Sequence, residues 1–357
     1  MPGKRKTTLK DLAEYAHLSV STVSGVVNNL EGFSEETRKK VWDAVHALDY
    51  VPNAQAKKLR SGRDAGSRLR SGLLMRIKYY GTEYPWKKRF DADLSQKFEE
   101  AAARRGYFMT NYCYEREKGF RCPALLNGLI DGVIIKSPHP EIVQMVRDKV
   151  PAVLLDISMP FETAGIPSVN ADMKQGFLAA FRDLKEAGHV RIGHLDADPA
   201  RSCFNKEKLN DDALRGAAQY CGLELPPCAD LSLDLNSEVS LREQIADAAR
   251  TFRPLLGGPH GISALATTNF QFASMLLEEL NKLGVRCPED LEVVAGSHLM
   301  ENPLPQISTV RNDWDKLIDI SLELLIRQIS GLELPGDQFF IASHYHKRSS
   351  ICVGPCF

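Results

Sequence analysis

Short apolar runs alternate with helical periods from residue 72 onward, and this alternation limits the possible fold more than any other feature of the sequence. The runs expected to form strands are 73–77, 108–112, 132–135, 152–156, 191–195, 264–268 and 291–295. Apolar residues at helical spacing predict helices at about 92–104, 140–148, 173–187, 212–221, 239–252, 271–283 and 314–330. Such an alternation is typical of parallel sheets in an α/β architecture, and we expect two lobes.

The first fifty residues show a different pattern, that of three short helices. Thr8 precedes apolar residues at helical spacing and has an acidic residue three positions on, which is a helix N-cap signature. Ser19 can cap a second helix over 20–28, and Ser34 can cap a third. His17 stands in the turn between the first two helices, where a left-handed backbone is expected and His is tolerated. Three such helices can bury one shared core.

The second of these helices has a polar outer side. The outward side chains are Ser19, Ser21, Thr22, Ser24 and Asn28. Short hydroxyl and amide side chains suit phosphate oxygens and base edges in a DNA major groove. The alternative is a helical bundle whose polar face is only solvated, and spacing alone does not decide between the two.

Charge is distributed unevenly along the chain. Residues 1–63 contain eleven Lys and Arg against seven Asp and Glu, a net charge of +4. Residues 64–357 contain 34 against 39, a net charge of −5. A small basic segment joined to a mildly acidic remainder fits a module that binds a polyanion.

Five segments of the N-terminal part resemble the lactose-repressor (LacI/GalR) family. They are residues 8–13, 18–24, 26–28, 34–38 and 48–53, and the match runs without a gap across 7–63. The resemblance implies that the second helix enters the major groove, with Val20 and Ser21 contacting bases and Gly25 one turn later. Gly25 departs from the family, where Arg or His is common, and it has no side chain with which to contact a base. We therefore expect few direct base contacts from this helix.

The segment after Pro52 predicts a short capped helix over 53–60, followed by a flexible basic connector over 61–68. The resemblance implies that this hinge folds on DNA and inserts Leu59 into a minor-groove step. Lys57, Lys58 and Arg60 would then meet phosphates. The complete set of expected DNA-contacting residues is Thr8, Ser19, Val20, Ser21, Thr22, Ser24, Asn28, Tyr50, Asn53, Ala56, Lys57, Leu59 and Arg60.

The remainder of the chain resembles the periplasmic-binding-protein-like body of the same family, more loosely, at 151–156, 169–172, 184–193, 283–290 and 305–310. Ligands of open α/β sheets lie beyond the carboxyl ends of strands. The strand-end residues at which the family often holds its effector correspond to Asp156, Asn269 and His298. Carboxylate and amide groups suit a sugar-like effector, although Asp and Asn at strand ends are also routine helix caps.

Two further residues are effector candidates, and two positions depart from the family. Trp86 could stack on a sugar face, although a packed or exposed aromatic is an equal alternative. Ala213 stands where many members have an effector-binding Arg; Arg201 is included as a replacement, with Lys206 and Arg215 left as alternatives. His298 stands where an Asp is common in the family.

Signatures of other protein classes are absent from the sequence. It contains no GxGxxG or GxxxxGK[ST] after a strand, no HExxH and no GxSxG, so no catalytic residue is expected. Eight cysteines without a CxxC pair argue against a zinc module and a disulfide framework. The triplet 344–346, His-Tyr-His, could indicate a metal together with Cys352, but on an alternating strand a solvated face is the commoner case. We expect no metal and no cofactor.

No apolar run approaches the roughly 20 residues that a bilayer requires. The basic start of the chain has no apolar signal region after it, so we expect a cytoplasmic location and no membrane contact.

The sequence and the resemblance together predict a three-part organisation. Residues 1–52 form an all-α helix-turn-helix domain, 53–70 a hinge helix and linker, and 71–357 a two-lobed α/β body that binds an effector and dimerises. The resemblance implies a transcriptional regulator, most often a repressor, whose affinity for double-stranded operator DNA changes when a sugar-like molecule binds between the lobes. A homodimer would match a pseudo-palindromic operator. A free sugar-binding protein and a sequence-blind architectural DNA binder are the alternatives.

Overall fold

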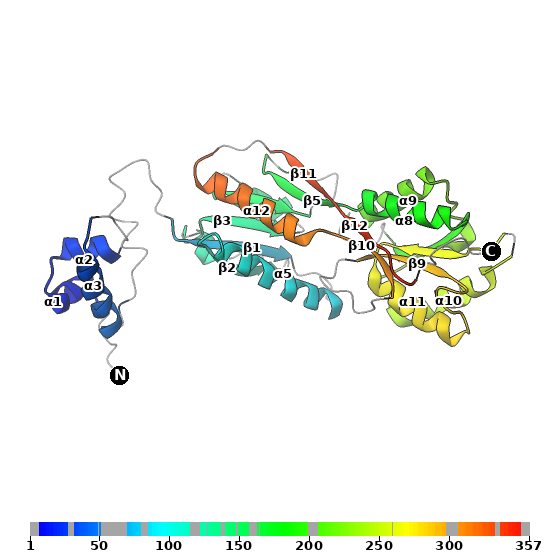
Figure 1. Cartoon of the computed structure of the whole chain (residues 1–357), viewed down its shortest axis with the longest axis horizontal. Coiled ribbons are helices and arrows are strands. Elements are labelled where there is room, and N and C mark those ends of the chain that lie inside the picture. Colours follow the sequence, from blue (N-terminus) through cyan, green and yellow to red (C-terminus); the bar gives the residue numbers. More distant parts are fainter. Residues whose placement is uncertain are drawn as a thin grey trace. The chain divides into compact units, whose positions relative to one another are not determined.

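The computed structural model divides into two compact units, Met1–Ser71 and Gly72–Phe357, which we describe separately (Figure 1). The structure describes residues 7–27, 32–48, 50, 70–79, 85–114, 122–126, 128–136, 140–147, 149–156, 163, 165–198, 206–258, 260–297, 306–332 and 336–350. Among these residues, no helix has the length and apolar character needed to cross a membrane.

The first unit contains the three expected helices, α1 (Leu9–Ala16), α2 (Val20–Val27) and α3 (Glu35–Ala47). Each helix contributes buried apolar residues to one shared core. This core consists of Leu12, Ala13, Val23, Val26, Val41 and Ala44. The helical spacing in the sequence therefore predicts both the helices and their inward faces.

Side chains cap the starts of α1 and α2, and a left-handed residue ends α1 before the turn between them. Thr8 and Asp11 form a reciprocal capping box, in which the Asp11 carboxylate accepts from the Thr8 backbone N–H at 2.6 Å. The Ser19 hydroxyl accepts from the Thr22 backbone N–H at 3.0 Å and so caps α2. His17 ends α1 with a φ of 54°, the left-handed conformation expected from the sequence. The expected caps and the expected turn are confirmed.

The first sheet of the second unit has the order β11-β5-β4-β3-β1-β2, and all its neighbours are parallel. Its strands are β1 (Leu73–Tyr79), β2 (Phe108–Tyr114), β3 (Gly132–Lys136), β4 (Ala152–Leu155), β5 (Ser168–Asp172) and β11 (Gln338–Ala342). Helices α5 (Pro85–Ala103) and α12 (Trp314–Ile329) form one apolar layer with one face of this sheet. Helices α6 (Pro123–Leu126) and α7 (Pro140–Val146) cover the other face. We call this assembly lobe 1.

The second sheet has the order β12-β10-β9-β8-β6-β7, with β12 antiparallel at one edge. Its strands are β6 (Ile192–Ala197), β7 (Asp230–Leu233), β8 (Ala264–Thr267), β9 (Glu292–Ser297), β10 (Ser308–Arg311) and β12 (His344–His346). Helices α10 (Leu241–Phe252) and α11 (Phe270–Lys282) cover one face, and α8 (Lys174–Glu186) and α9 (Lys206–Tyr220) cover the other (Figure 1). Short 3-10 turns η2 (Pro227–Ala229) and η3 (Arg253–Leu255) follow α9 and α10. We call this assembly lobe 2.

The expected α/β class with parallel sheets and two lobes is confirmed, but several element boundaries were not predicted. All seven expected strands are present, whereas β5, β7, β10 and β11 were not predicted as strands. Helix α5 begins at Pro85 instead of about 92, and α9 at Lys206 instead of about 212. The first turns of both helices are rich in charged residues, although in α5 Trp86 and Phe90 continue the apolar spacing of Leu94 and Phe98 toward the start of the helix.

The chain crosses between the two lobes three times, and each crossing is one or two residues long. Met173 joins β5 to α8, residues 312–313 join β10 to α12, and Ser343 joins β11 to β12. Ser343 connects the other two crossings, because its backbone N–H donates to the Asp172 carbonyl at 2.8 Å and its hydroxyl donates to Asn312 Oδ1 at 2.7 Å. We call these three hydrogen-bonded crossings the hinge.

A fully buried arginine links α5 to the first sheet. Arg76 on β1 donates through Nη2 to Ser95 Oγ at 2.6 Å and through Nε to Asn111 Oδ1 at 2.9 Å. Its Nη1 lies 3.5 Å from the Asp91 carboxylate, and its guanidinium carbon lies 5.9 Å from the centre of the Phe98 ring. The Arg76 guanidinium therefore links α5, β1 and β2 inside lobe 1.

A second buried charge network joins α9 to β6 and β7 in lobe 2. His194 Nε2 lies 3.1 Å from carboxylate oxygens of both Asp196 and Asp211, and Nδ1 lies 2.9 Å from Asp230. Arg215 donates to Asp211 at 2.8 Å and to Asp230 at 2.7 Å. Two cations therefore balance most of the charge of three carboxylates. The network links the edge strand β7 to β6 and α9.

The network keeps its own groups ionised. Burial would lower the pKa of His194, but hydrogen bonds to Asp196, Asp211 and Asp230 outweigh burial and raise that pKa well above 6.5. Hydrogen bonds from His194 and Arg215 hold the pKa of Asp230 far below its ordinary value. The imidazolium therefore contributes its full stability below about pH 6.5, and this contribution is lost as the pH rises toward the pKa of the folded state.

We expect His194→Gln to lower the free energy of unfolding of lobe 2 by about 3 to 5 kcal/mol at pH 6, because it leaves buried carboxylates without their cation. The difference from the unmodified protein should shrink above pH 6.5 by up to about 1.4 kcal/mol per pH unit. Urea unfolding from pH 6 to 9 measures both effects, with the exposed His260→Gln as the control. A difference that stays constant over this range contradicts a charged His194.

Candidate functional site

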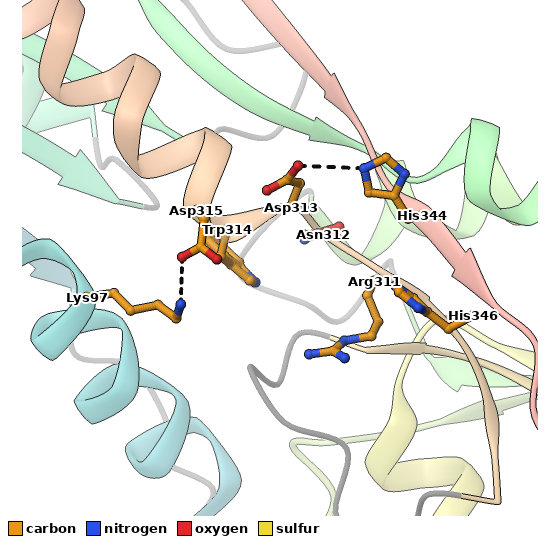
Figure 2. Close-up of a pocket in the computed structure, with 8 residues that line it drawn as sticks. All are labelled: Lys97, Arg311, Asn312, Asp313, Trp314, Asp315, His344 and His346. Atoms are coloured by element: carbon orange, nitrogen blue, oxygen red, sulfur yellow. Dashed lines mark hydrogen bonds and ion pairs between the residues drawn. The ribbon is translucent and has the colours of Figure 1, made fainter. Parts of the chain in front are cut away.

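A pocket with a cavity volume of about 190 Å³ lies on the hinge (Figure 2). Its walls come from α5 in lobe 1, from the crossing between β10 and α12, and from β12. The lining residues are Lys97, Arg311, Asn312, Asp313, Trp314, Asp315, His344 and His346. Because the crossing between β10 and α12 supplies part of its wall, a molecule bound here would contact a segment that joins the two lobes.

The start of α12 positions the central residues of the pocket. Asp313 caps the helix by accepting from the Lys316 backbone N–H at 3.0 Å. Trp314 follows as the first helical residue, and its ring packs against Phe90 of α5 with the ring centres 5.1 Å apart. The polar crossing and the aromatic residue after it are therefore held by both a cap and a core contact.

Within the part of the chain that the structure describes, two buried N–H donors of the pocket have no hydrogen-bond partner. These are Asn312 Nδ2 and Trp314 Nε1, on side chains of residues that are 8% and 4% exposed. The carbonyl oxygen of Asn312 already accepts from Ser343. A buried donor without a partner costs about 1 to 3 kcal/mol, which a ligand with oxygen acceptors would recover.

Charged side chains surround these donors. Lys97 Nζ lies 2.6 Å from Asp315 Oδ1, and His344 Nε2 lies 3.6 Å from Asp313 Oδ2 (Figure 2). Burial, together with the charges of Arg311 and Arg348, lowers the pKa of His346 below 6.5. Neutral imidazole at this position offers both a donor and an acceptor to a polar ligand at neutral pH.

The first unit presents the predicted polar side of α2. Ser19, Val20 and Ser21 are exposed, with Val20 37% exposed, while Thr22 and Ser24 are half-buried. Thr8 is exposed beside the start of α1, and Tyr50 is half-buried against the helical core. The structure therefore brings together the described members of the expected DNA-contacting set on one small helical unit. Asn28, Asn53, Ala56, Lys57, Leu59 and Arg60 lie outside the described residues.

The structure adds an observation about Gly25, which the sequence places one turn after Val20 and Ser21 on α2. In the structure Gly25 is buried, because the ring of Phe33 covers it. A Cβ added at Gly25 would lie only 2.5 Å from Phe33 Cε2.

The two described effector candidates, Asp156 and Asn269, are not among the lining residues of the pocket. Asp156 follows β4, is 4% exposed and has a φ of 57°, a conformation that non-glycine residues rarely adopt. Asn269 caps α11, and its carbonyl oxygen accepts from the Gln271 backbone N–H at 2.9 Å. Trp86 lies within α5, but its side chain, like all of His298 and Arg201, lies outside the described residues.

Sequence reasoning did not identify Asn312 and Trp314. The available signal was the order of residues at 312–314, where an amide, an acid and an aromatic stand between an apolar strand and an amphipathic helix. His344 and His346 were considered only as metal ligands or as a solvated face. The structure places both in the pocket lining and on β12; Cys352 lies outside the described residues.

One group of side chains in lobe 2 has ligand atoms close enough for a metal ion. His194, Asp196 and Asp211 each place such an atom within 4.8 Å of the others. Arg215 already binds Asp211, and the Thr268 backbone N–H donates to Asp196 at 2.7 Å. These donors and the imidazolium supply the positive charge there, so we assign the group to the structural network of lobe 2.

Nearly the whole chain is similar in structure to solved transcriptional regulators. It resembles the structure described as a lac repressor dimer bound to operator and the anti-inducer ONPF, with a TM-score of 0.74, 21% identity and coverage of 98% of this chain and 100% of that chain. It also resembles a transcriptional regulator CelR–cellobiose complex, with a TM-score of 0.62, 21% identity and coverage of 97% and 100%. These similarities establish a common fold.

Sequence comparisons identify the family. Residues 8–53 match the model for bacterial regulatory proteins of the lacI family, and residues 181–351 match the model for the periplasmic binding protein-like domain. The ribose operon repressor of Escherichia coli (strain K12) is 26% identical over 338 residues, which cover 90% of this chain and 93% of that protein. The order of the two domains, the helical unit and the two-lobed fold all agree with these matches. The chain belongs to the lacI family of bacterial regulatory proteins.

Proposed function

We propose that this chain is a sequence-specific transcriptional regulator that binds operator DNA through its N-terminal helices and responds to a small oxygen-rich molecule bound at the hinge. The observation that carries the proposal is the position of the pocket, which is built on the crossing between β10 and α12 and contains two buried donors without partners among the described residues. Its relatives are named as repressors, which favours regulation over catalysis.

DNA contact is assigned to α2 and to its capped start. Ser19, Ser21 and Thr22 offer hydroxyl groups at the N-terminus of the helix, where backbone N–H groups also favour phosphate oxygens. Val20 offers an exposed apolar side chain of the kind that contacts a thymine methyl group. We also propose that the expected short helix at 53–60, which is separate from the hinge between the lobes, inserts Leu59 into the DNA minor groove.

We infer a homodimer that binds a pseudo-palindromic operator. One helical unit of this size covers only one half-site, and two units related by a twofold axis would cover two half-sites one helical turn or more apart. The similar lac repressor structure is described as a dimer on its operator, which supports this inference. The proposed organisation is a helix-turn-helix domain at 1–52, a hinge and linker at 53–70 and an effector-binding, dimerising body at 71–357.

The effector class follows from the pocket chemistry. Two unpaired N–H donors, a neutral imidazole and a Trp ring suit a ligand that presents several oxygen acceptors and an apolar ring face. Sugars and sugar phosphates have this character, and relatives are named after ribose and sucrose. A ligand that binds one lobe arrangement more tightly than another changes DNA affinity by that difference, typically about 1 to 3 kcal/mol.

We expect Leu59→Ala to reduce affinity for the selected operator by roughly ten-fold while changing the affinity for random duplex little, because the kink depends on the DNA sequence that is deformed. Lys57→Ala is the matched control and should weaken both by similar factors, with a smaller salt slope. Binding-site selection followed by salt titrations measures these quantities. Equal losses for operator and random DNA in Leu59→Ala would exclude the wedge.

We expect Trp314→Phe to reduce effector affinity by about ten-fold, because it keeps the ring contact with Phe90 but removes one donor. A thermal-shift screen against sugars and sugar phosphates identifies the ligand, since a ligand that binds only the folded state raises stability. Trp42→Phe, at an exposed tryptophan of α3, is the control. If Asp156→Ala abolishes the response and Trp314→Phe leaves it intact, the effector binds beyond β4 instead of at the hinge.

The two roles of Asn269 can be separated by substitution. Asn269→Ala should lower the free energy of unfolding by about 1 kcal/mol because α11 loses its cap, whereas Asn269→Ser retains a capping oxygen and should cost much less. Both variants remove the amide. Loss of effector affinity in the stable Ser variant therefore supports a ligand contact, and unchanged affinity limits Asn269 to the cap.

A further inference from the structure

Gly25 has an unusual environment for its place on α2. Gly25 lies four residues after the exposed Ser21 on α2. Because an α-helix completes a turn in 3.6 residues, the two positions are only about 40° apart around the helix and lie on the same side. It lies about 160° around the helix from the buried Val23. A residue on this outer side should be exposed, yet Gly25 is buried.

Phe33 accounts for this burial. The three atoms nearest to the position of a Cβ on Gly25 are all carbons of the Phe33 ring. Phe33 is half-buried, and it also packs against the helical core of the first unit. The ring therefore extends from the core across the outer side of α2, where the side chain of residue 25 would otherwise lie.

Local structure after Phe33 explains this direction. Ser34 caps α3 by accepting from the Thr37 backbone N–H at 3.3 Å, which places Phe33 immediately before the cap. An apolar residue at that position often packs on the fourth residue of its own helix, which here is Arg38. The Phe33 ring packs on α2, which glycine at position 25 permits because any larger residue would overlap the ring.

We propose that Phe33 contacts a base pair in place of a side chain at position 25 and thereby contributes to operator specificity. This inference rests on the proposed function, because it requires that the outer side of α2 enters the major groove. The ring has no hydrogen-bonding atom, so it can distinguish base pairs only by apolar contact. The thymine C5-methyl group is the one apolar group that base edges present in the major groove. Phe33 therefore favours a thymine next to the bases that Val20 and Ser21 contact.

A selection experiment on the full-length protein tests the inference. The unmodified protein should select a half-site with a thymine at one position, and Phe33→Val should lose the preference at that position alone. Leu48→Val is the matched control, since Leu48 is another half-buried apolar residue of the same core. If the unmodified protein selects no sequence, the proposed function fails, whereas a Phe33→Val selection identical to that of the unmodified protein overturns only the role of Phe33.

Replacing that thymine by uracil isolates the methyl group. Affinity of the unmodified protein should fall about four-fold, the value of one buried methyl group, and affinity of Phe33→Val should not change. An equal fall in both proteins assigns the methyl contact to another residue and overturns the proposal. Gly25→Ala gives an independent arm if Phe33→Val unfolds, because the added Cβ must displace the ring while alanine favours the helix. Gly25→Ala should lose the same thymine preference, and a retained preference also overturns the proposal.

Discussion

Ser343 links the three backbone crossings that join the two lobes. Its N–H donates to the carbonyl of Asp172, the last residue of β5 before the Met173 crossing, and its hydroxyl donates to Asn312 of the crossing between β10 and α12. Crossings of one or two residues leave few backbone dihedrals that can change, so the lobes can rotate about the hinge but cannot separate freely. The pocket lies on this hinge, and its unpaired donors are on the residues of one crossing and of the helix that follows it.

Each lobe is internally tied by its own buried charge. Arg76 connects β1 to α5 and β2 in lobe 1, whereas His194 and Arg215 connect β6 and β7 to α9 in lobe 2. Moving any of these elements would leave a buried charge without its partner, at a cost of several kcal/mol. Relative motion is therefore cheaper at the hinge than inside either lobe. This difference supports the proposal that a small ligand acts through the angle between the two lobes.

The sequence predicted the strands that are determined by a local residue pattern. It did not predict the strands and the pocket that depend on tertiary contacts. Strands β3, β4 and β8 are continuous apolar runs buried on both faces, so their composition identified them. Strands β7 and β11 lie at sheet edges with alternating or exposed residues, and β5 and β10 contain polar side chains that are buried only because helices cover them. The pocket was not predicted for the same reason, since Lys97, Asn312 and His344 come from three separated segments.

The first unit shows that the effect of Gly25 on α2 depends on Phe33, a residue outside that helix. Glycine within a helix weakens it by about 1 kcal/mol and removes a side chain, which indicates a weaker reading surface when the helix is considered alone. The aromatic residue at position 33 restores apolar contact at that place and shields the helix backbone there from water. The two positions consequently form one unit: a large residue at 25 excludes the ring, and a small residue at 33 exposes the glycine. Under the proposed function, the DNA specificity of α2 is a property of the pair, and a change at either position would alter which surface meets the DNA.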